Sequence, residues 1–365
     1  MKNTFGNSVA ITLFGESHGQ AIGAILDGIA PGIAIDEEFI AGQMAKRRSI
    51  SALSTPRREE DEVKILSGVI NGYTTGTPIT FLIENKDTKS ADYNQLSEIA
   101  RPGHADYTAF CKYHGYSDPR GGGHFSGRIT AGIVAAGAVA LTALKNKGIH
   151  IATHIYACGG ICDRHFQNIE EDINILSKCD FAVLNDDISI KMQQEITKAR
   201  AEGDSVGGVL ETAVIGFPRG VGEPWFDSLE GVLSHAIFSI PAVKGVEFGD
   251  GFALCDMRAS AANDPFHMEE NAVVTDTNRC GGILGGISNG MPLLFRTAIK
   301  PTPSIFKEQN TVNFKNGSNT VLSLQGRHDP AIVHRAAVVL DSMTALVLCD
   351  QLALRYGTDY LGISN

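Results

Sequence analysis

Residues 120–144, RGGGHFSGRITAGIVAAGAVALTAL, join a glycine-rich loop to an uncharged apolar run. The run, 129–144, has about 16 residues, fewer than the roughly 20 that a membrane span needs, so it predicts a helix buried in the core. Three consecutive glycines let the backbone approach a ligand closely. Because Arg120 and Arg128 flank them, we expect the amides before this helix to form an anion site. A flexible, solvated loop is the alternative.

Histidine, arginine and glycine gather in three further segments: GESHG (15–19), RPGHADYT (101–108) and GRHDP (326–330). Arginine supplies forked donors for phosphate or carboxylate, and histidine supplies a proton near neutral pH. Together with the loop, these segments predict an enzyme whose site binds an anion and moves protons.

The candidate residues for proton transfer are His18, His104 and Asp329. His18 can instead be a turn histidine, and Asp329, which precedes a proline, can be the N-cap of the last helix. His104 is the stronger candidate, because a neighbouring carboxylate such as Asp106 favours the imidazolium and fixes its tautomer.

Composition limits the kinds of partner that the chain can have. Of its 365 residues, 43% are hydrophobic and 20% are charged, as in ordinary soluble proteins. A net charge of −10 argues against nucleic acid, whose phosphates attract basic surfaces. Seven cysteines without a disulfide framework indicate a cytoplasmic protein. No HExxH or paired CxxC motif occurs, so no metal is expected.

Helix and strand patterns are interleaved along the first part of the chain. Residues 9–14 resemble a strand that delivers GESHG at its end, and 63–84 contain two β-rich runs that predict an antiparallel pair. Asp36 is expected to cap a helix that ends near Arg48, with charges that complement the helix dipole.

Two later helices are expected. Pro224 begins one of them, with Trp225, Leu229, Leu233 and Ile237 on one face. Asp329 and Pro330 open the last helix, which Gly357 stops.

The fold class follows from this order of elements. No linker or repeat divides the chain, and the candidate site residues run from 15 to 330, so 1–365 is expected to be a single domain. No GxGxxG motif follows the first strand. The prediction is therefore an α+β fold with antiparallel sheets rather than a Rossmann sheet.

The ordered set of motifs resembles chorismate synthases over essentially the whole chain. The motifs are GESHG, RPGHADYT, RGGG before a helix, VKGVEFGDGF, GGILGGISNG, KPTPS and GRHDP. The resemblance implies a lyase of the shikimate pathway of aromatic amino acid biosynthesis. Such an enzyme converts 5-enolpyruvylshikimate 3-phosphate to chorismate and phosphate by an anti 1,4-elimination, using reduced FMN with no net redox change. It also implies a helical layer between antiparallel β-sheets and assembly as a homotetramer.

The resemblance further implies roles for individual residues. His18 would protonate the departing phosphate, His104 would stabilise and protonate the reduced flavin, and Asp329 would act through flavin N5 in removing the substrate proton. The arginines implied to hold the substrate's phosphate and carboxylates are Arg47, Arg48, Arg101, Arg120 and Arg128. The implied FMN contacts are His124, Phe125, Ser126, Pro241, Ala242, Gly285, Lys300, Pro301, Thr302, Pro303, Ser304 and Arg327.

The chain departs from the family pattern in three places. His124-Phe125-Ser126 stands where many relatives have Arg-Ser-Ser, and Pro241 stands where they have Asn, so those flavin contacts would use the backbone. SISALSTP, after Arg48, lacks the family's Pro-Gly and following arginine, which leaves an NADP contact near Arg47 and Arg48 open.

The expected partners are the small substrate and an external flavin-reducing system, with no nucleic acid and no membrane. Two rival functions remain. The first is an FMN oxidoreductase that takes hydride from NAD(P)H, which the absence of a dinucleotide fingerprint disfavours. The second is a non-catalytic flavin- or anion-binding protein, which would have no need of His18 and His104 as proton donors.

Overall fold

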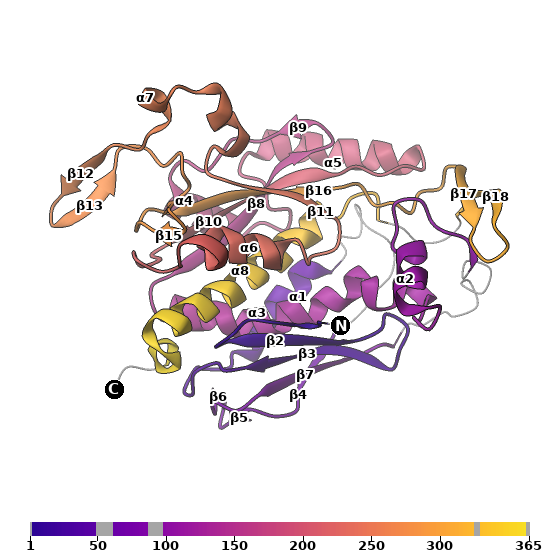
Figure 1. Ribbon diagram of the computed structural model, residues 1–365, viewed down its shortest axis with the longest axis horizontal. Helices are drawn as coiled ribbons and strands as arrows, with labels where there is room; N and C mark the ends of the chain where they lie inside the picture. The colour runs from indigo at the N-terminus through magenta and orange to yellow at the C-terminus, as the bar shows by residue number, and fades with distance from the viewer. Residues whose placement is uncertain (1, 49–60, 87–97, 325–328, 363–365) are drawn as a thin grey trace.

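Two antiparallel sheets enclose a layer of helices (Figure 1). The computed structural model describes residues 2–48, 61–86, 98–324 and 329–362. The first sheet has the order β1-β2-β3-β7-β4 and the second the order β11-β16-β10-β8-β9. Helices α1, α3 and α8 lie between them, while α4 and α5 cover the outer face of the second sheet (Figure 1). The predicted α+β class, with helices between antiparallel sheets, is confirmed.

The strands of the two large sheets have the following bounds. In the first sheet they are β1 (Thr4–Phe5), β2 (Ala10–Gly15), β3 (Ala21–Asp27), β4 (Val63–Ile65) and β7 (Ile79–Glu84). In the second they are β8 (His150–Cys158), β9 (Ile161–Cys162), β10 (Gly208–Ile215), β11 (Val243–Phe248) and β16 (Leu293–Ile299). The predicted antiparallel pair within 63–84 is confirmed, because β4 pairs with β7.

The remaining strands form small hairpins. They are β5 (Val69–Ile70) with β6 (Tyr73–Thr74), β12 (Phe266–Glu269) with β13 (Ala272–Thr275), β14 (Ile283–Leu284) with β15 (Ile287–Ser288), and β17 (Gln309–Asn313) with β18 (Ser318–Leu322).

The α-helices are α1 (Glu37–Arg47), α2 (Asp106–Tyr113), α3 (Thr130–Lys145), α4 (Ile169–Leu176), α5 (Asp186–Ala201), α6 (Leu229–Ile237), α7 (Ala259–Ala262) and α8 (Val333–Tyr356). Five short 3-10 helices complete the described elements: η3 (Arg120–Phe125), η4 (Gly127–Ile129), η5 (Trp225–Asp227), η6 (Gly251–Asp256) and η7 (Thr358–Leu361).

Helix α3 lies at the centre of the molecule, as the apolar run predicted. It packs against α8 so closely that a Cβ atom at Gly137 would lie 2.3 Å from the Cβ of Ser342. The segments Gly127–Lys145 and Val333–Tyr356 are long and apolar enough to cross a membrane by composition, yet 83% and 89% of their most apolar windows are buried inside the protein. Both are core helices of the sandwich.

Helix ends confirm two predictions and correct two others. The Asp36 carboxylate accepts a hydrogen bond from the Phe39 amide at 2.9 Å and caps α1, and α8 stops at Gly357. However, α8 begins at Val333, so Asp329 does not cap it. Trp225 does not share a helical face with Leu229: it precedes the true cap, Ser228, and is 86% exposed.

The last helix also holds the beginning of the chain. The carboxylate of Asp350 in α8 accepts hydrogen bonds from the amides of Asn7, Ser8 and Val9, at 2.7 to 3.1 Å. Because Asp350 is only 2% exposed, these four bonds from three amides satisfy a buried polar group. They tie the start of the first sheet to the C-terminal helix.

Candidate functional site

A cavity of about 1130 Å³ opens where the predicted segments meet. It lies beside α3 and α8. It reaches the C-terminal end of α1 and the segment after β16. Fourteen of the predicted site residues line it: Arg47, Arg48, His104, His124, Phe125, Ser126, Arg128, Pro241, Ala242, Lys300, Thr302, Pro303, Ser304 and Asp329. The structure therefore brings together segments that are distant in sequence.

The glycines of the RGGG segment are required by both conformation and space. Gly121, Gly122 and Gly123 have φ angles of 59°, 83° and 54°, which side chains disfavour. A Cβ at Gly121 would lie 2.2 Å from Cε1 and Nδ1 of His18. One at Gly122 would lie 3.3 Å from Nε2 of His104. Adjacent glycines thus hold the two candidate histidines close together.

His104 is oriented by a carboxylate. Its Nδ1 lies 2.7 Å from Oδ1 of Asp106 and 3.1 Å from Nη2 of Arg101. Because a carboxylate only accepts hydrogen bonds, the shorter contact favours the tautomer that carries the proton on Nδ1. Nε2, the nitrogen closer to Gly122, is then the atom that can exchange a proton at the cavity. Burial opposes ionisation of Asp106, but hydrogen bonds from Arg101 and His104 outweigh it and lower the pKa of that carboxyl.

His18 lies behind the glycine loop rather than on the cavity wall. It is 7% exposed, and its ring packs against Gly121, which does line the cavity. The adjoining Ser17 amide donates to the carbonyl of Gly123 at 3.1 Å. The GESHG and RGGG segments are therefore joined by main-chain contact.

Buried cations gather at the end of α1. Arg47 and Arg128 both pair with Asp61, and Arg128 also donates to Oδ1 of Asn85 at 3.0 Å. Burial lowers the pKa of the Arg47 guanidinium, while the attraction of Asp61 opposes this effect. Arg48 also lines the cavity, so three arginines lie at this end, and their guanidinium groups can bind anions.

Two of the predicted substrate arginines are engaged elsewhere. Arg101 donates from Nε and Nη2 to the two oxygens of Asp106, each at 2.7 Å. Arg120 forms a similar fork with Asp118 and is half-exposed. Neither is part of the cavity wall. Arg101 contacts His104 both through Asp106 and directly, with its Nη2 3.1 Å from Nδ1, so it lies beside the histidine rather than on the cavity wall.

The KPTPS segment forms the wall opposite the glycine loop. Lys300 donates from Nζ to the carbonyl of Gly103, next to His104. Ser304 is buried, and the Thr302 hydroxyl is buried with no hydrogen-bond partner among the described residues. An ammonium and hydroxyls in this arrangement can bind a phosphate group.

Two predicted cofactor contacts do not reach this wall, and a third lies outside the described residues. Pro301 packs toward Gly207, where a Cβ would lie 2.9 Å from its Cδ, and Gly285 lies in the turn between β14 and β15. Both are absent from the cavity lining. Arg327 lies outside the residues that the structure describes, as does the SISALSTP segment.

The sequence reasoning missed Asp61 and Arg335, which both line the cavity. Asp61 pairs with partners 14 and 67 residues away, a spacing that has no sequence signal. Arg335 was more accessible to prediction, because it is the one arginine or lysine in the apolar stretch 329–340. A charged side chain in an apolar helix is unusual unless it is paired, which makes Arg335 a candidate for the site.

The described residues contain no group of three or more histidine, cysteine, aspartate or glutamate side chains that could hold a metal ion.

Comparison with known proteins points to one family. A family model described as chorismate synthase matches residues 9–353. A chorismate synthase from Dehalococcoides mccartyi is 48% identical over 358 residues, 98% of each chain. Another, from Thermococcus gammatolerans, is 46% identical over 350 residues, 96% of this chain and 97% of the relative. A crystal structure of chorismate synthase is similar with a TM-score of 0.75 at 28% identity, covering 97% and 94% of the two chains.

Proposed function

Because the chain belongs to the chorismate synthase family, we propose that it forms chorismate and phosphate from 5-enolpyruvylshikimate 3-phosphate, with reduced FMN as its cofactor. One observation carries the proposal: a single cavity is lined by His104, Asp329 and the paired Arg47 and Arg128. Proton-transfer groups and anion-binding groups therefore share one cavity, as the reaction requires.

The reaction is an anti 1,4-elimination. The ring C–O bond to phosphate breaks and the oxygen keeps the electron pair. A ring proton is lost, and the electrons of its C–H bond enter the conjugated double bonds of chorismate. Atoms and electrons balance without an oxidant. The protein's tasks are to bind three anionic groups, to neutralise the departing phosphate and to accept the proton.

The KPTPS wall supports reduced FMN as the bound cofactor. The buried Thr302 hydroxyl, which lacks a hydrogen-bond partner among the described residues, and the Lys300 ammonium suit the FMN phosphate or ring edge. Phe125 and Ala242 provide apolar surface for a flat ring system. When bound, reduced flavin supplies electron density while the C–O bond breaks.

The chain's own residues are proposed to move protons at defined atoms. His104 exchanges its proton at Nε2, because Asp106 holds the proton on Nδ1. His18, behind Gly121, protonates the departing phosphate. The Asp329 carboxylate accepts the proton that the ring loses. The anionic groups of the substrate are bound by the arginines that line the cavity, Arg47, Arg48 and Arg128. Two further arginines, Arg101 and Arg120, lie outside the cavity lining and support this charge from a distance.

An anaerobic assay tests this function directly. Purified protein with chemically reduced FMN and 5-enolpyruvylshikimate 3-phosphate is expected to release chorismate and phosphate in equal amounts. NADPH consumption in proportion to product would indicate the rival FMN oxidoreductase instead. Flavin binding without any product would indicate a non-catalytic flavin protein.

The proton-donor assignments have their own test. We expect His18→Ala and His104→Ala each to lower kcat by about 10²-fold or more, the usual scale for a positioned acid or base. FMN affinity, measured by flavin fluorescence, and the melting temperature are expected to stay near wild type. Normal turnover in either variant removes that residue from the catalytic set.

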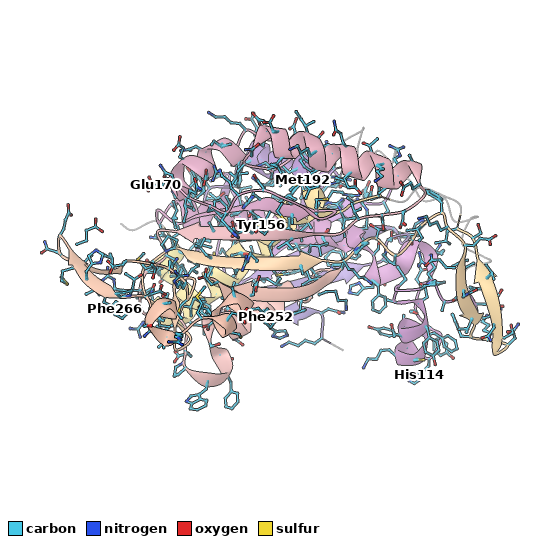
Figure 2. The ribbon with its side chains drawn as sticks, turned by 90° about the horizontal axis from the view of Figure 1, so that it is seen from above. His114, Tyr156, Glu170, Met192, Phe252 and Phe266 are labelled. Atoms are coloured by element: carbon cyan, nitrogen blue, oxygen red, sulfur yellow. The ribbon has the colours of Figure 1, made fainter. Side chains whose placement is uncertain are left out.

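Assembly as a homotetramer in the cytoplasm completes the proposal. Phe252 and Phe266, both labelled in Figure 2, are 80% and 61% exposed, and Trp225 and Phe226 are 86% and 95% exposed. Exposed aromatic side chains of this size support a protein interface. Light scattering on the purified chain tests the tetramer.

A further inference from the structure

We infer that Arg335 is a positioning residue, which holds the Asp329 carboxylate in place against the C-terminal end of α1. The inference rests on the proposed function, in which Asp329 accepts the substrate proton. Arg335 donates hydrogen bonds to Asp329 and to Arg47. All three residues line the same cavity.

The two contacts use different edges of one guanidinium. Nη1 of Arg335 donates to Oδ2 of Asp329 at 2.5 Å, and Nε donates to the carbonyl oxygen of Arg47 at 2.8 Å. The side chains of Arg335 and Asp329 are 25% and 13% exposed, so the pair is largely shielded from water. A planar guanidinium that is fixed at two points also fixes the carboxylate that it binds.

Asp329 needs such a partner because the backbone around it is irregular. It lies four residues before α8, in a segment that is neither helix nor strand. A carboxylate on such a segment is not oriented by regular secondary structure. Arg335, in contrast, is part of the first turn of α8, which is packed in the core. The rigid helix therefore supplies the orientation that the segment lacks.

The contact with Arg47 extends this support to the anion-binding end. The last carbonyl groups of a helix have no partner within the helix, and a cation there also complements the helix dipole. Arg335 donates a hydrogen bond to the last carbonyl group of α1, and its positive charge complements the dipole of that helix. Because the Arg47 side chain pairs with Asp61, which also holds Arg128, the contacts form one chain from Arg128 to Asp329. The proton acceptor and the anion-binding arginines are thereby held in one unit.

The alternative is that Arg335 binds an anionic group of the substrate directly. The two roles separate in steady-state kinetics. Loss of a direct contact in the ground state raises KM, whereas displacement of the proton acceptor lowers kcat. We expect Arg335→Gln to lower kcat by about 10²-fold, the scale of a displacement of about 1 Å, with KM changed by less than about threefold. Arg335→Lys, which lacks the fork, is expected to recover only part of this loss.

A double variant shows whether Arg335 acts through Asp329. Asp329→Asn is expected to be severely impaired, and adding Arg335→Gln to it is expected to lower kcat by less than about threefold more, because the two residues act as one unit. Arg164→Gln is the matched control: Arg164 also pairs with a carboxylate, Asp172, at 2.5 Å, but far from the cavity lining. It is expected to leave kcat unchanged.

Hydrogen exchange gives a readout that does not depend on turnover. In the flavin-free protein, Arg335→Gln is expected to speed amide exchange in residues 329–332, whereas Arg164→Gln is not. The positioning role is overturned if the double variant loses a further 10²-fold in kcat. It is also overturned if Arg335→Gln raises KM with normal kcat, or if it leaves amide exchange unchanged. A wild-type chain that forms no chorismate contradicts the proposed function instead. The exchange result then still decides whether Arg335 orders the Asp329 segment.

Discussion

At the scale of single residues, Asp106 is the group that decides how His104 behaves. Its carboxylate accepts from Nδ1 at 2.7 Å and is held in turn by a fork from Arg101. We expect Asp106→Asn to lower kcat at least tenfold, since an amide no longer specifies which nitrogen carries the proton. Single-turnover measurements with reduced FMN would record the effect.

Asp172→Asn is a suitable control for this change, because Asp172 is also a buried carboxylate in an arginine pair but contacts no candidate catalytic residue. It is expected to reduce the melting temperature and leave kcat intact. If Asp106→Asn behaves in the same way, Asp106 serves stability alone.

Arg48 tests the anion-binding end of the cavity at the same scale. Arg48→Ala is expected to raise KM more than Lys198→Ala does, and added salt is expected to reduce the difference, because screening weakens charge attraction. Lys198 is an exposed residue of α5 outside the cavity lining. Equal KM values for the two variants would mean that Arg48 does not bind the substrate and only complements the dipole at the C-terminal end of α1.

At the scale of elements, the glycine loop between α2 and α3 acts as the spacer that sets the position of the histidines. In Gly121→Ala the new methyl group would lie 2.2 Å from the His18 ring, so the ring or the loop must move. We expect kcat to fall about 10²-fold, as for other small displacements at a reacting centre.

Gly160→Ala separates this effect from backbone strain. Gly160 also has a positive φ, 83°, but a Cβ there meets no atom within 4 Å. It should cost about 1–2 kcal/mol of stability, the penalty of a left-handed conformation, without a change in kcat. A similar loss of kcat in both variants would show that spacing of His18 is not the cause.

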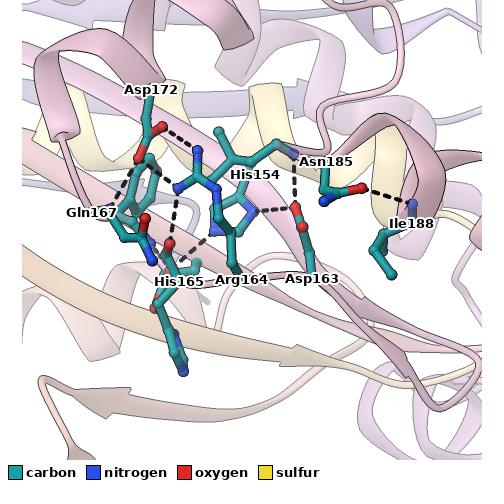
Figure 3. A network of polar contacts seen from close by, with 11 residues as sticks. His154, Asp163, Arg164, His165, Gln167, Asp172, Asn185 and Ile188 are labelled. Atoms are coloured by element: carbon teal, nitrogen blue, oxygen red, sulfur yellow. Dashed lines mark hydrogen bonds and ion pairs between the residues drawn. The ribbon is translucent and has the colours of Figure 1, made fainter.

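At the scale of the whole molecule, a buried ionic network on the outer side of the second sheet links stability to pH (Figure 3). Nε2 of the fully buried His154 lies 2.9 Å from Oε2 of Glu211, and its Nδ1 lies 3.7 Å from Asp163. Burial opposes protonation of His154, but attraction to these carboxylates outweighs it and raises its pKa. Burial also opposes ionisation of Glu211 and Asp163, yet the histidine lowers the pKa of each.

The signs of these shifts predict a window of maximum stability. The raised pKa of His154 gives stability that is complete below its ordinary value of 6.5 and is lost as pH rises through the higher folded value. The lowered pKa values of Glu211 and Asp163 give stability that is complete above their ordinary values of 4.5 and 3.8 and is lost in acid. We therefore expect the melting-temperature difference between wild type and His154→Gln to be largest near pH 5–6, between these ordinary values. A difference that does not vary from pH 4 to pH 9 would contradict the network's role.

Much of the fold could be predicted from the sequence, because local rules govern it. The apolar run of α3, the Asp36 cap and the Gly357 stop all follow from short-range chemistry, and each is confirmed. The start of α8 could not be predicted in this way. Asp before Pro favours a cap, but the Asp329 carboxylate instead accepts from Arg335, six residues further along the chain.

The candidate site was predictable by residue type more than by geometry. Glycine beside histidine indicated the loop, whereas the pairing of Arg47 and Arg128 through Asp61 depends on contacts between distant segments. The engagement of Arg101 and Arg120 had a local signal that was overlooked. Each has an aspartate partner, five and two residues away, which is close enough to form the observed forks.

The hydrogen bonds from the first strand region to Asp350 have a consequence for synthesis on the ribosome. The amides of Asn7 to Val9 have their hydrogen-bond acceptor, Asp350, more than 340 residues later in the chain. They cannot form these bonds until Asp350 has been translated. Until α8 leaves the exit tunnel, the face of α3 that packs against α8 stays uncovered. The sandwich therefore closes only after α8 has been translated, and chaperones that shield exposed apolar surface are most needed before that point.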